Sequence, residues 1–315
     1  MALGLAASPA GASSSRSASV NNDTLTVTGG SSGDRLALRL AAGSTGTLEV
    51  DFDDNGSADF SFDRSTFSKI AVNTRSGNDQ FRIDQVNGAF ADEAITVDGG
   101  AGRDVLNGGD GTEEFIGGSG NDAVDGNKGN DTANLGSGND TFTWDPGDGS
   151  DLIDGQTGRD TLDFNGAGAA EVMSLSANGQ RSLFLRDLGN IRMDMDNVEN
   201  LDLTALGGAD LVTVNDMSGT DFRRADVDLG GGDAAVDTLT LNGTANADRI
   251  EVDVRGGTEV EANGLQTSLQ ITGSEPTDLL QINTLDGNDT VDVDNNVDNV
   301  IGVSVDLGSG QPAPR

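Results

Sequence analysis

Apolar side chains recur at alternate positions in many short segments of the chain, such as 36–40, 201–203 and 280–282. Gly, Asn and Asp residues bound these segments. Alternation with a period of two predicts β-strands that bury one face, and the clusters between them predict turns. No segment shows a sustained helical period with caps. We therefore expect an all-β chain made of short strands.

Longer segments, about 23–83, 160–214 and 237–293, repeat one another. Each opens near an Asp-Thr-Leu phrase, has a second acid eleven residues after that aspartate, and ends soon after a Gly-x-Asp phrase. A repeat of this kind predicts a solenoid, in which each unit buries its apolar face on the next. The second acids are Asp34, Glu171 and Asp248, and the Gly-x-Asp phrases end at Asp79, Asp210 and Asp289.

A shorter period of nine residues runs between residues 99 and 163, broken by one interval of eleven. Segments 99–107 and 117–125 read G-G-x-G-x-D-x-U-x in full, where U is apolar. Positions 7 to 9 predict a very short strand with its apolar residue inward, so that eighteen residues make one coil. Acids of the same parity then stack on one edge. The first edge carries Asp104, Asp122, Asp140 and Asp160, and the second carries Glu113, Asp131 and Asp151.

The residue types in this phrase favour a metal site. Glycines at positions 1, 2 and 4 permit backbone angles that other residues avoid, and they let carbonyl oxygens approach an ion closely. The acid at position 6 adds a hard, charged oxygen, and Ca²⁺ takes six to eight oxygens at about 2.3–2.6 Å. We expect calcium ions between successive loops of one edge. The candidate ligating residues are Gly100, Gly102, Asp104, Gly109, Gly111, Glu113, Gly118, Gly120, Asp122, Gly129, Asp131, Gly136, Gly138, Asp140, Gly149, Asp151, Gly158 and Asp160.

Residues 99–163 resemble the RTX (haemolysin-type calcium-binding) repeat family, whose fold is a parallel β-roll. The resemblance implies Ca²⁺ as the cofactor and a calcium-binding parallel β-roll flanked by β-solenoid or β-helix-like repeat units. The expected segments are a flexible N-terminus at 1–19, a first β-repeat unit at 20–98, the roll at 99–163, a second unit at 160–230 and a third unit with a truncated end at 231–315.

Several positions depart from the family phrase. Glu113 replaces the aspartate and reaches farther, so we expect a looser site there. Asn127 replaces a glycine, and Trp144 belongs to a two-residue insertion. Asp289 stands in an isolated phrase, with no neighbouring copy of the phrase nine residues away, so we expect it to matter less for calcium-dependent folding than Asp122. The alternative to a roll is a run of turns or plain disorder, but turns need no fixed period.

The strongly acidic charge of the chain links its folding to metal binding. It has 53 acidic and 18 basic residues and a net charge of −35, which excludes generic nucleic-acid binding. An acidic, Gly-rich chain with few aromatic residues approaches the composition of disordered proteins. Calcium would neutralise the clustered carboxylates. We therefore expect folding and metal binding to be one equilibrium in the roll.

The composition also limits the chemistry. The chain has no His, Tyr or Cys, so a Ser-His-Asp triad, an H-E-x-x-H zinc site and a Cys-His dyad are all excluded. Carboxylate-only catalysis stays open. An RTX-containing polysaccharide lyase or epimerase is the alternative function, although such enzymes usually use Tyr, His or Lys, and the only lysines here are Lys69 and Lys128.

We expect instead a non-enzymatic, calcium-stabilised module with a structural or adhesin-like role. The expected location is secreted, extracellular or at the cell surface, and the expected partners are calcium ions and a cell-surface or matrix component. No apolar run approaches the roughly 18 residues that span a bilayer. Residues 1–12 contain a short apolar stretch and an Ala10-Gly-Ala12 site, which indicates either a partial secretion signal or an ordinary terminus. The oligomeric state stays open.

Residues 51–59 leave two interpretations open. Their acids are spaced as in a D-x-D-x-[DN]-G calcium loop, but Phe62 stands where that loop has a glutamate. Apolar residues mirrored across Asn55-Gly56 favour a β-hairpin without metal.

Overall fold

The computed structural model describes residues 16–309, and it divides the chain into two compact units, 1–159 and 160–315. The expected secretion signal and residues 310–315 lie outside the described residues. Helix within 16–309 is limited to two 3₁₀ turns, η1 (Arg64–Thr66) and η2 (Val297–Asn299), and neither is long enough to cross a membrane. The prediction of an all-β chain is confirmed, whereas the finer five-segment division stays a prediction.

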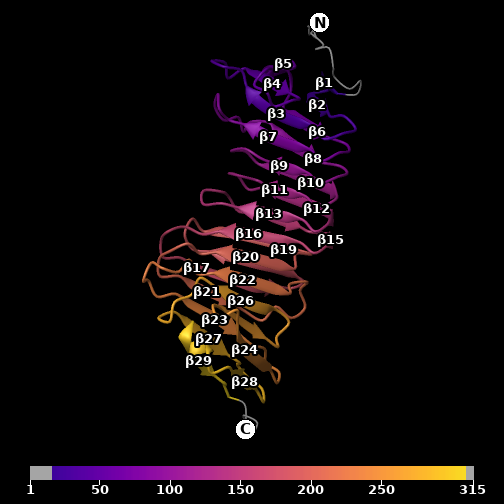
Figure 1. Ribbon diagram of the computed structural model, residues 1–315. Helices are drawn as coiled ribbons and strands as arrows, with labels where there is room; N and C mark the ends of the chain where they lie inside the picture. The colour runs from indigo at the N-terminus through magenta and orange to yellow at the C-terminus, as the bar shows by residue number, and fades with distance from the viewer. Residues whose placement is uncertain (1–15, 310–315) are drawn as a thin grey trace. The chain divides into compact units, whose positions relative to one another are not determined.

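The first unit consists of two sheets whose strands stack along the chain, from indigo to magenta in Figure 1. One sheet runs in the order β1 (Ser17–Asn21), β2 (Thr24–Thr28), β6 (Lys69–Asn73), β8 (Ala94–Asp98), β10 (Glu113–Ser119), β12 (Thr132–Gly138) and β14 (Leu152–Asp154), with β15 (Thr157–Gly158) beside β12. The other runs β13 (Thr141–Trp144), β11 (Ala123–Asp125), β9 (Val105–Asn107), β7 (Gln80–Asp84), β3 (Arg35–Leu40), β4 (Thr47–Asp51) and β5 (Phe60–Asp63).

Residues 99–163, called the nonapeptide block below, have the expected coil length. Strands β9, β11 and β13 pair in parallel so that Leu106, Val124 and Phe142 lie in register, eighteen residues apart. Phe115 of β10 lies opposite Ala133 of β12 with the same spacing. All five side chains are buried between the sheets. The block is therefore a parallel β-roll, as the resemblance implied, with the eighteen-residue coil that the period of nine predicted.

The sole tryptophan belongs to the core of this roll. Trp144 is fully buried, and its indole N–H donates a hydrogen bond of 2.8 Å to the carbonyl oxygen of Gly149. The insertion at this point therefore adds a core side chain, and its polar atom is satisfied by the loop that follows.

The second unit is also built of two sheets. One runs in the order β19 (Ile191–Asp196), β18 (Arg181–Arg186), β17 (Val172–Asn178), β21 (Leu211–Val214), β23 (Thr238–Asn242), β27 (Leu279–Asn283) and β29 (Gly302–Asp306). The other runs β28 (Thr290–Val293), β24 (Arg249–Arg255), β25 (Glu259–Asn263), β26 (Ser268–Thr272), β22 (Arg224–Asp228), β20 (Asn200–Thr204) and β16 (Thr161–Asn165).

The three long sequence repeats share one topology. The first strand of each repeat, β2, β16 or β23, pairs in parallel with β6, β20 or β27. Between these two strands lies an antiparallel excursion, β3–β5, β17–β19 or β24–β26. The strand after the Gly-x-Asp phrase, β7, β21 or β28, pairs in parallel with the first strand of the excursion. The repeats are therefore solenoid coils lengthened by an antiparallel excursion.

Residues 51–59 connect two strands of the first excursion. Strands β4 and β5 pair antiparallel, with Leu48 opposite Phe62, so the predicted hairpin is present. The buried Asp51 carboxylate accepts hydrogen bonds from the Arg39 guanidinium at 2.9 Å and from the Gly56 N–H at 2.8 Å. These donors already neutralise and satisfy the carboxylate, as a cation would in a calcium loop.

Candidate calcium sites

The acids of the nonapeptide block form two ladders, one on each edge of the roll. The backbone N–H of Asp104 donates to Asp122 Oδ1 at 2.8 Å, and that of Asp122 donates to Asp140 Oδ1 at 2.7 Å. On the other edge, the N–H of Glu113 donates to Asp131 Oδ1 at 2.7 Å. Acids eighteen residues apart therefore stack in contact, as their parity predicted.

In Asp104, Asp122 and Asp131, one carboxylate oxygen accepts the N–H of the preceding rung, and the second oxygen is left for another partner. Asp104, Asp122 and Asp131 are at most 2 % exposed, yet their Oδ2 atoms have no hydrogen-bond partner. The Glu113 carboxylate accepts from the Gly109 N–H at 2.9 Å through Oε2, and its buried Oε1 has no partner. A buried ionised oxygen without a donor or cation costs several kcal/mol, so these atoms call for a positive charge.

The glycines leave room for that charge. A Cβ on Gly99 would lie 2.8 Å from Asp104 Oδ2 and 2.9 Å from the carbonyl oxygen of Gly117 in the next coil. A Cβ on Gly117 would lie 2.9 Å from Asp122 Oδ2 and 2.3 Å from the carbonyl oxygen of Leu135. Carboxylate and carbonyl oxygens therefore face the same spots between coils. Hard oxygen donors of this kind suit Ca²⁺.

Few carboxylates lie near each of these positions between coils. Within residues 16–309, no three acidic side chains come together as a carboxylate cluster around one point. A cation in the block would therefore be held by one or two carboxylates and mainly by backbone carbonyls. The ion would supply charge neutralisation and a bridge between coils, and the residues themselves fit that role.

Burial also changes the acidity of these groups. It raises the pKa of Asp131 to about 8, with further contributions from Glu113 and Asp151. Burial likewise raises the pKa of Asp104 to about 7, that of Asp151 to about 7 and that of Asp140 to about 6. Without metal, much of the ladder therefore holds protons near neutral pH, and a bound cation would displace them.

This predicts an unusual pH dependence for the chelated protein. Because the folded-state pKa of Asp131 lies above the ordinary value of 3.8, protonation stabilises the metal-free roll fully below about pH 4, and this stabilisation is lost as the pH rises through about 8. The melting temperature in chelator should therefore be higher at about pH 5 than at about pH 8, by on the order of 5–10 °C. Calcium should bind more tightly at about pH 8 than at about pH 5, because protons compete with the ion for the carboxylates.

Thermal melts in chelator at the two pH values measure this effect. The Asp131→Asn variant is the control, and the difference between its two melting temperatures should be smaller. A wild-type melting temperature that rises with pH in chelator would contradict the assignment.

A comparison with protein-family models matches the RTX calcium-binding nonapeptide repeat (4 copies) at residues 96–124, 107–142 and 146–166. The chain contains RTX calcium-binding repeats. The match covers less than half of the chain, and no curated protein matches the sequence. The RTX repeats coincide with the two ladders of the nonapeptide block, so calcium binding is the property that sequence and geometry share.

The predicted ligating residues of the RTX repeats fall on the expected edges. The first edge brings together Gly100, Gly102, Asp104, Gly118, Gly120, Asp122, Gly136, Gly138, Asp140 and Gly158, and the second brings together Gly109, Gly111, Glu113, Gly129, Asp131, Gly149 and Asp151. Asp160 belongs to the second unit, where its N–H donates to Glu199 Oε2 at 2.7 Å. The ligation of calcium by the individual residues stays a prediction.

The ladders extend beyond the RTX repeats, which the sequence reasoning missed. In the first unit, the N–H of Asp34 donates to Asp79, and that of Asp79 donates to Asp104. In the second unit, the N–H of Asp248 donates to Asp289 Oδ1 at 2.8 Å, so the view of Asp289 as isolated is wrong. The excursion between coils lengthens the spacing to 41 residues but preserves the register. The Gly-x-Asp phrases of the long repeats are the sequence signal that could have revealed these additional rungs.

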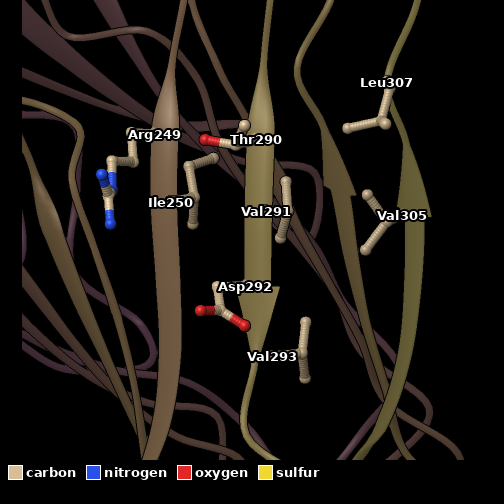
Figure 2. A pocket seen from close by; sticks show the side chains of 8 residues that line it. All are labelled: Arg249, Ile250, Thr290, Val291, Asp292, Val293, Val305 and Leu307. Carbon is tan, nitrogen blue, oxygen red and sulfur yellow. The ribbon is translucent and has the colours of Figure 1, made fainter. Parts of the chain in front are cut away.

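A hollow of about 680 Å³ lies at the last strands of the second unit, β24, β28 and β29. Figure 2 shows Val291 and Val293 facing Val305 and Leu307 across it. Arg249, which also lines it, pairs with Glu251 at 3.3 Å. The hollow is thus a gap lined by both apolar and polar residues, in which Arg249 and Asp292 are the ionisable side chains and Arg249 is already paired with Glu251.

Proposed function

We propose that this protein is a secreted, calcium-stabilised solenoid with a structural or adhesin-like role outside the cell or at its surface, and that it is not an enzyme. The observation that carries the proposal is the pair of buried carboxylate ladders in the RTX repeats, with an unpaired oxygen on Asp104, Asp122 and Asp131. These acids are buried and hydrogen-bonded to neighbouring coils, and they do not line an open cleft. Their arrangement supports a role in holding a repetitive scaffold together.

The proposed partner is a cell-surface or matrix component. A net charge of −35 repels acidic polysaccharides and membranes, so binding to them should require calcium as a bridge. Retention of the full chain on immobilised acidic polysaccharide, in calcium and in chelator, tests this part. Retention that is equal in both conditions would contradict calcium bridging, and no retention on any surface in calcium would contradict the adhesin-like role.

A carbohydrate-active enzyme is the second candidate. The observation in its favour is a row of acids, Asp163, Asp202 and Asp226, in register on β16, β20 and β22. Burial raises the pKa of Asp202, and Asp226 and Asp163 add to the rise, which suits a proton-transfer group. A shallow groove of about 150 Å³ lies beside Asp202 and Asp226.

Cleavage of acidic polysaccharides in calcium, followed by the absorbance of unsaturated products and by reducing ends, separates the two candidates. We expect no product with the wild-type chain. Product that disappears in the Asp202→Asn variant, while calcium-dependent folding is retained, would establish the enzyme and overturn the proposal.

A further inference from the structure

The second unit contains a pair of stacked loops that lie outside the residues matched by the RTX family. Residues 205–210 end on Asp210, the Gly-x-Asp acid of the second long repeat, and residues 229–237 carry the phrase Gly-Gly-Gly-Asp. A Cβ on Gly230 would lie 1.6 Å from the carbonyl oxygen of Leu206, so the two loops are in direct backbone contact. The same close contact joins Gly102 to the carbonyl of Gly77 in the first unit.

Asp210 is in the same state as the acids of the nonapeptide block. Its side chain is fully buried, and Oδ1 accepts the backbone N–H of Glu171 at 2.8 Å. Its Oδ2 is buried and has no hydrogen-bond partner. Asp104 and Asp122 combine the same three properties, with Oδ1 accepting the N–H of Asp79 and of Asp104, respectively. The unpaired oxygen needs a proton or a cation, because the fold gives it no donor.

The surroundings of Asp210 favour a cation. The charged groups that act most strongly on it are Asp237, Glu171 and Asp233, and all are negative. The charge of Glu171 is already balanced by a buried ion pair with Arg186. Asp237 accepts the Asp210 N–H at 2.8 Å, and Asp233 accepts the Gly208 N–H at 2.8 Å, so neither donates a hydrogen bond to Oδ2.

We propose that a calcium ion binds between loops 205–210 and 229–237, with the Oδ2 atom of Asp210 as its charged ligand. Carbonyl oxygens of the two loops supply the further hard donors. Glu171, the preceding acid of the same ladder, holds no ion because Arg186 occupies the place of the cation. The site is separate from the RTX repeats, so the second unit has a calcium response of its own.

The experiment is hydrogen exchange on the full chain in calcium chloride and in chelator, read separately for peptides from 205–237 and from 99–163. In the wild type, exchange in 205–237 should slow about tenfold when free calcium is at about ten times the dissociation constant. In the Asp210→Asn variant this response should disappear, while the response of 99–163 persists. Calorimetry should show one bound calcium fewer in the variant.

Asp278 provides the matched control. It is buried in the same ladder, but both of its oxygens accept backbone N–H groups, from Asp237 at 3.0 Å and from Glu275 at 2.6 Å. The Asp278→Asn variant should therefore lose stability equally in calcium and in chelator. In chelator, Asp210→Asn should exchange no faster than the wild type, because the substitution removes a buried charge without breaking the rung.

Several outcomes would overturn this site. They are a wild-type response absent from 205–237, a response of 205–237 that survives in Asp210→Asn, or an equal loss of response in Asp278→Asn. The wild-type measurement alone decides the matter if the variant fails to fold. Failure of this site with a retained response in 99–163 leaves the proposed function intact, whereas loss of both responses refutes the proposed function as well.

Discussion

At about pH 8, where the ladder carboxylates have lost their protons, chelation of calcium is expected to unfold residues 99–163 while strands of the flanking coils persist. Each nonapeptide buries about one apolar side chain, whereas ordering its backbone costs roughly 1–2 kcal/mol per residue. The unpaired oxygens of Asp104, Asp122 and Asp131 add a further cost when they are ionised. The excursions bury more apolar area, for example through the fully buried Phe184 and Leu38, and need less help from metal.

Calcium should reverse this loss by mass action. An ion held at about 100 times its dissociation constant stabilises the folded chain by about 2.7 kcal/mol per site. For a unit of this size, that corresponds to about 5–10 °C in melting temperature per site. On the order of four or five ions in the block would give a large combined shift. Magnesium should substitute poorly, since it requires shorter, octahedral coordination and retains its waters.

Trp144 makes the measurement direct, because the only tryptophan of the chain is buried inside the nonapeptide block. Its emission should shift to the red on chelation and return on adding calcium. Hydrogen exchange of 99–163 against that of the flanking coils provides the spatial control. Protection of 99–163 that is unchanged by chelation would show that the metal does not hold the roll together.

The Gly118→Ala substitution should be among the most damaging single changes in the chain. Gly118 has a φ of +103°, and a Cβ there would lie 2.0 Å from the carbonyl oxygen of Gly100 in the coil below. The methyl group can fit only if two stacked coils separate. We expect a loss of about 3–5 kcal/mol in the free energy of unfolding, together with weakened calcium binding at this edge.

Gly219→Ala is the matched control. Gly219 has a similar φ of +92°, but no atom lies within 4 Å of its hypothetical Cβ. Its substitution should cost only the backbone strain of about 1–2 kcal/mol. Chemical denaturation of both variants in calcium isolates the contribution of coil stacking. Similar losses in the two variants would mean that φ alone explains the glycines.

The nonapeptide block was predictable because one rule, a fixed period, determines which residues meet. Eighteen-residue spacing alone places Asp104 beside Asp122 and Leu106 beside Val124. The topology of the long repeats was likewise visible as aligned phrases. The sequence could not reveal which residues pair with each other across an excursion, because the excursions differ in length. The Glu171–Arg186 pair depends on how β17 and β18 fold back on each other, and the rung from Asp248 to Asp289 depends on the register of two strands.

The individual state of each carboxylate was also beyond the pattern. Asp104, Asp210 and Asp278 all lie in ladders and all accept a backbone N–H. Only the local loop decides whether the second oxygen meets another N–H, as in Asp278, or none, as in Asp104 and Asp210. This distinction depends on atomic positions within one turn, and these positions cannot be read from sequence phrases that look alike.

Within residues 16–309, the rungs of the ladders point the same way along the chain. In each, the N–H of an earlier coil donates to the carboxylate of a later one, as from Asp104 to Asp122 or from Asp210 to Asp237. A coil that has just emerged from the ribosome therefore lacks the acceptor for its N–H until the following coil arrives. Trimming the stack from its C-terminal side exposes an N–H group to water, whereas trimming from its N-terminal side exposes a charged carboxylate. The two ends of the scaffold are thus unequal, and growth in the N-to-C direction always leaves the newest coil unfinished.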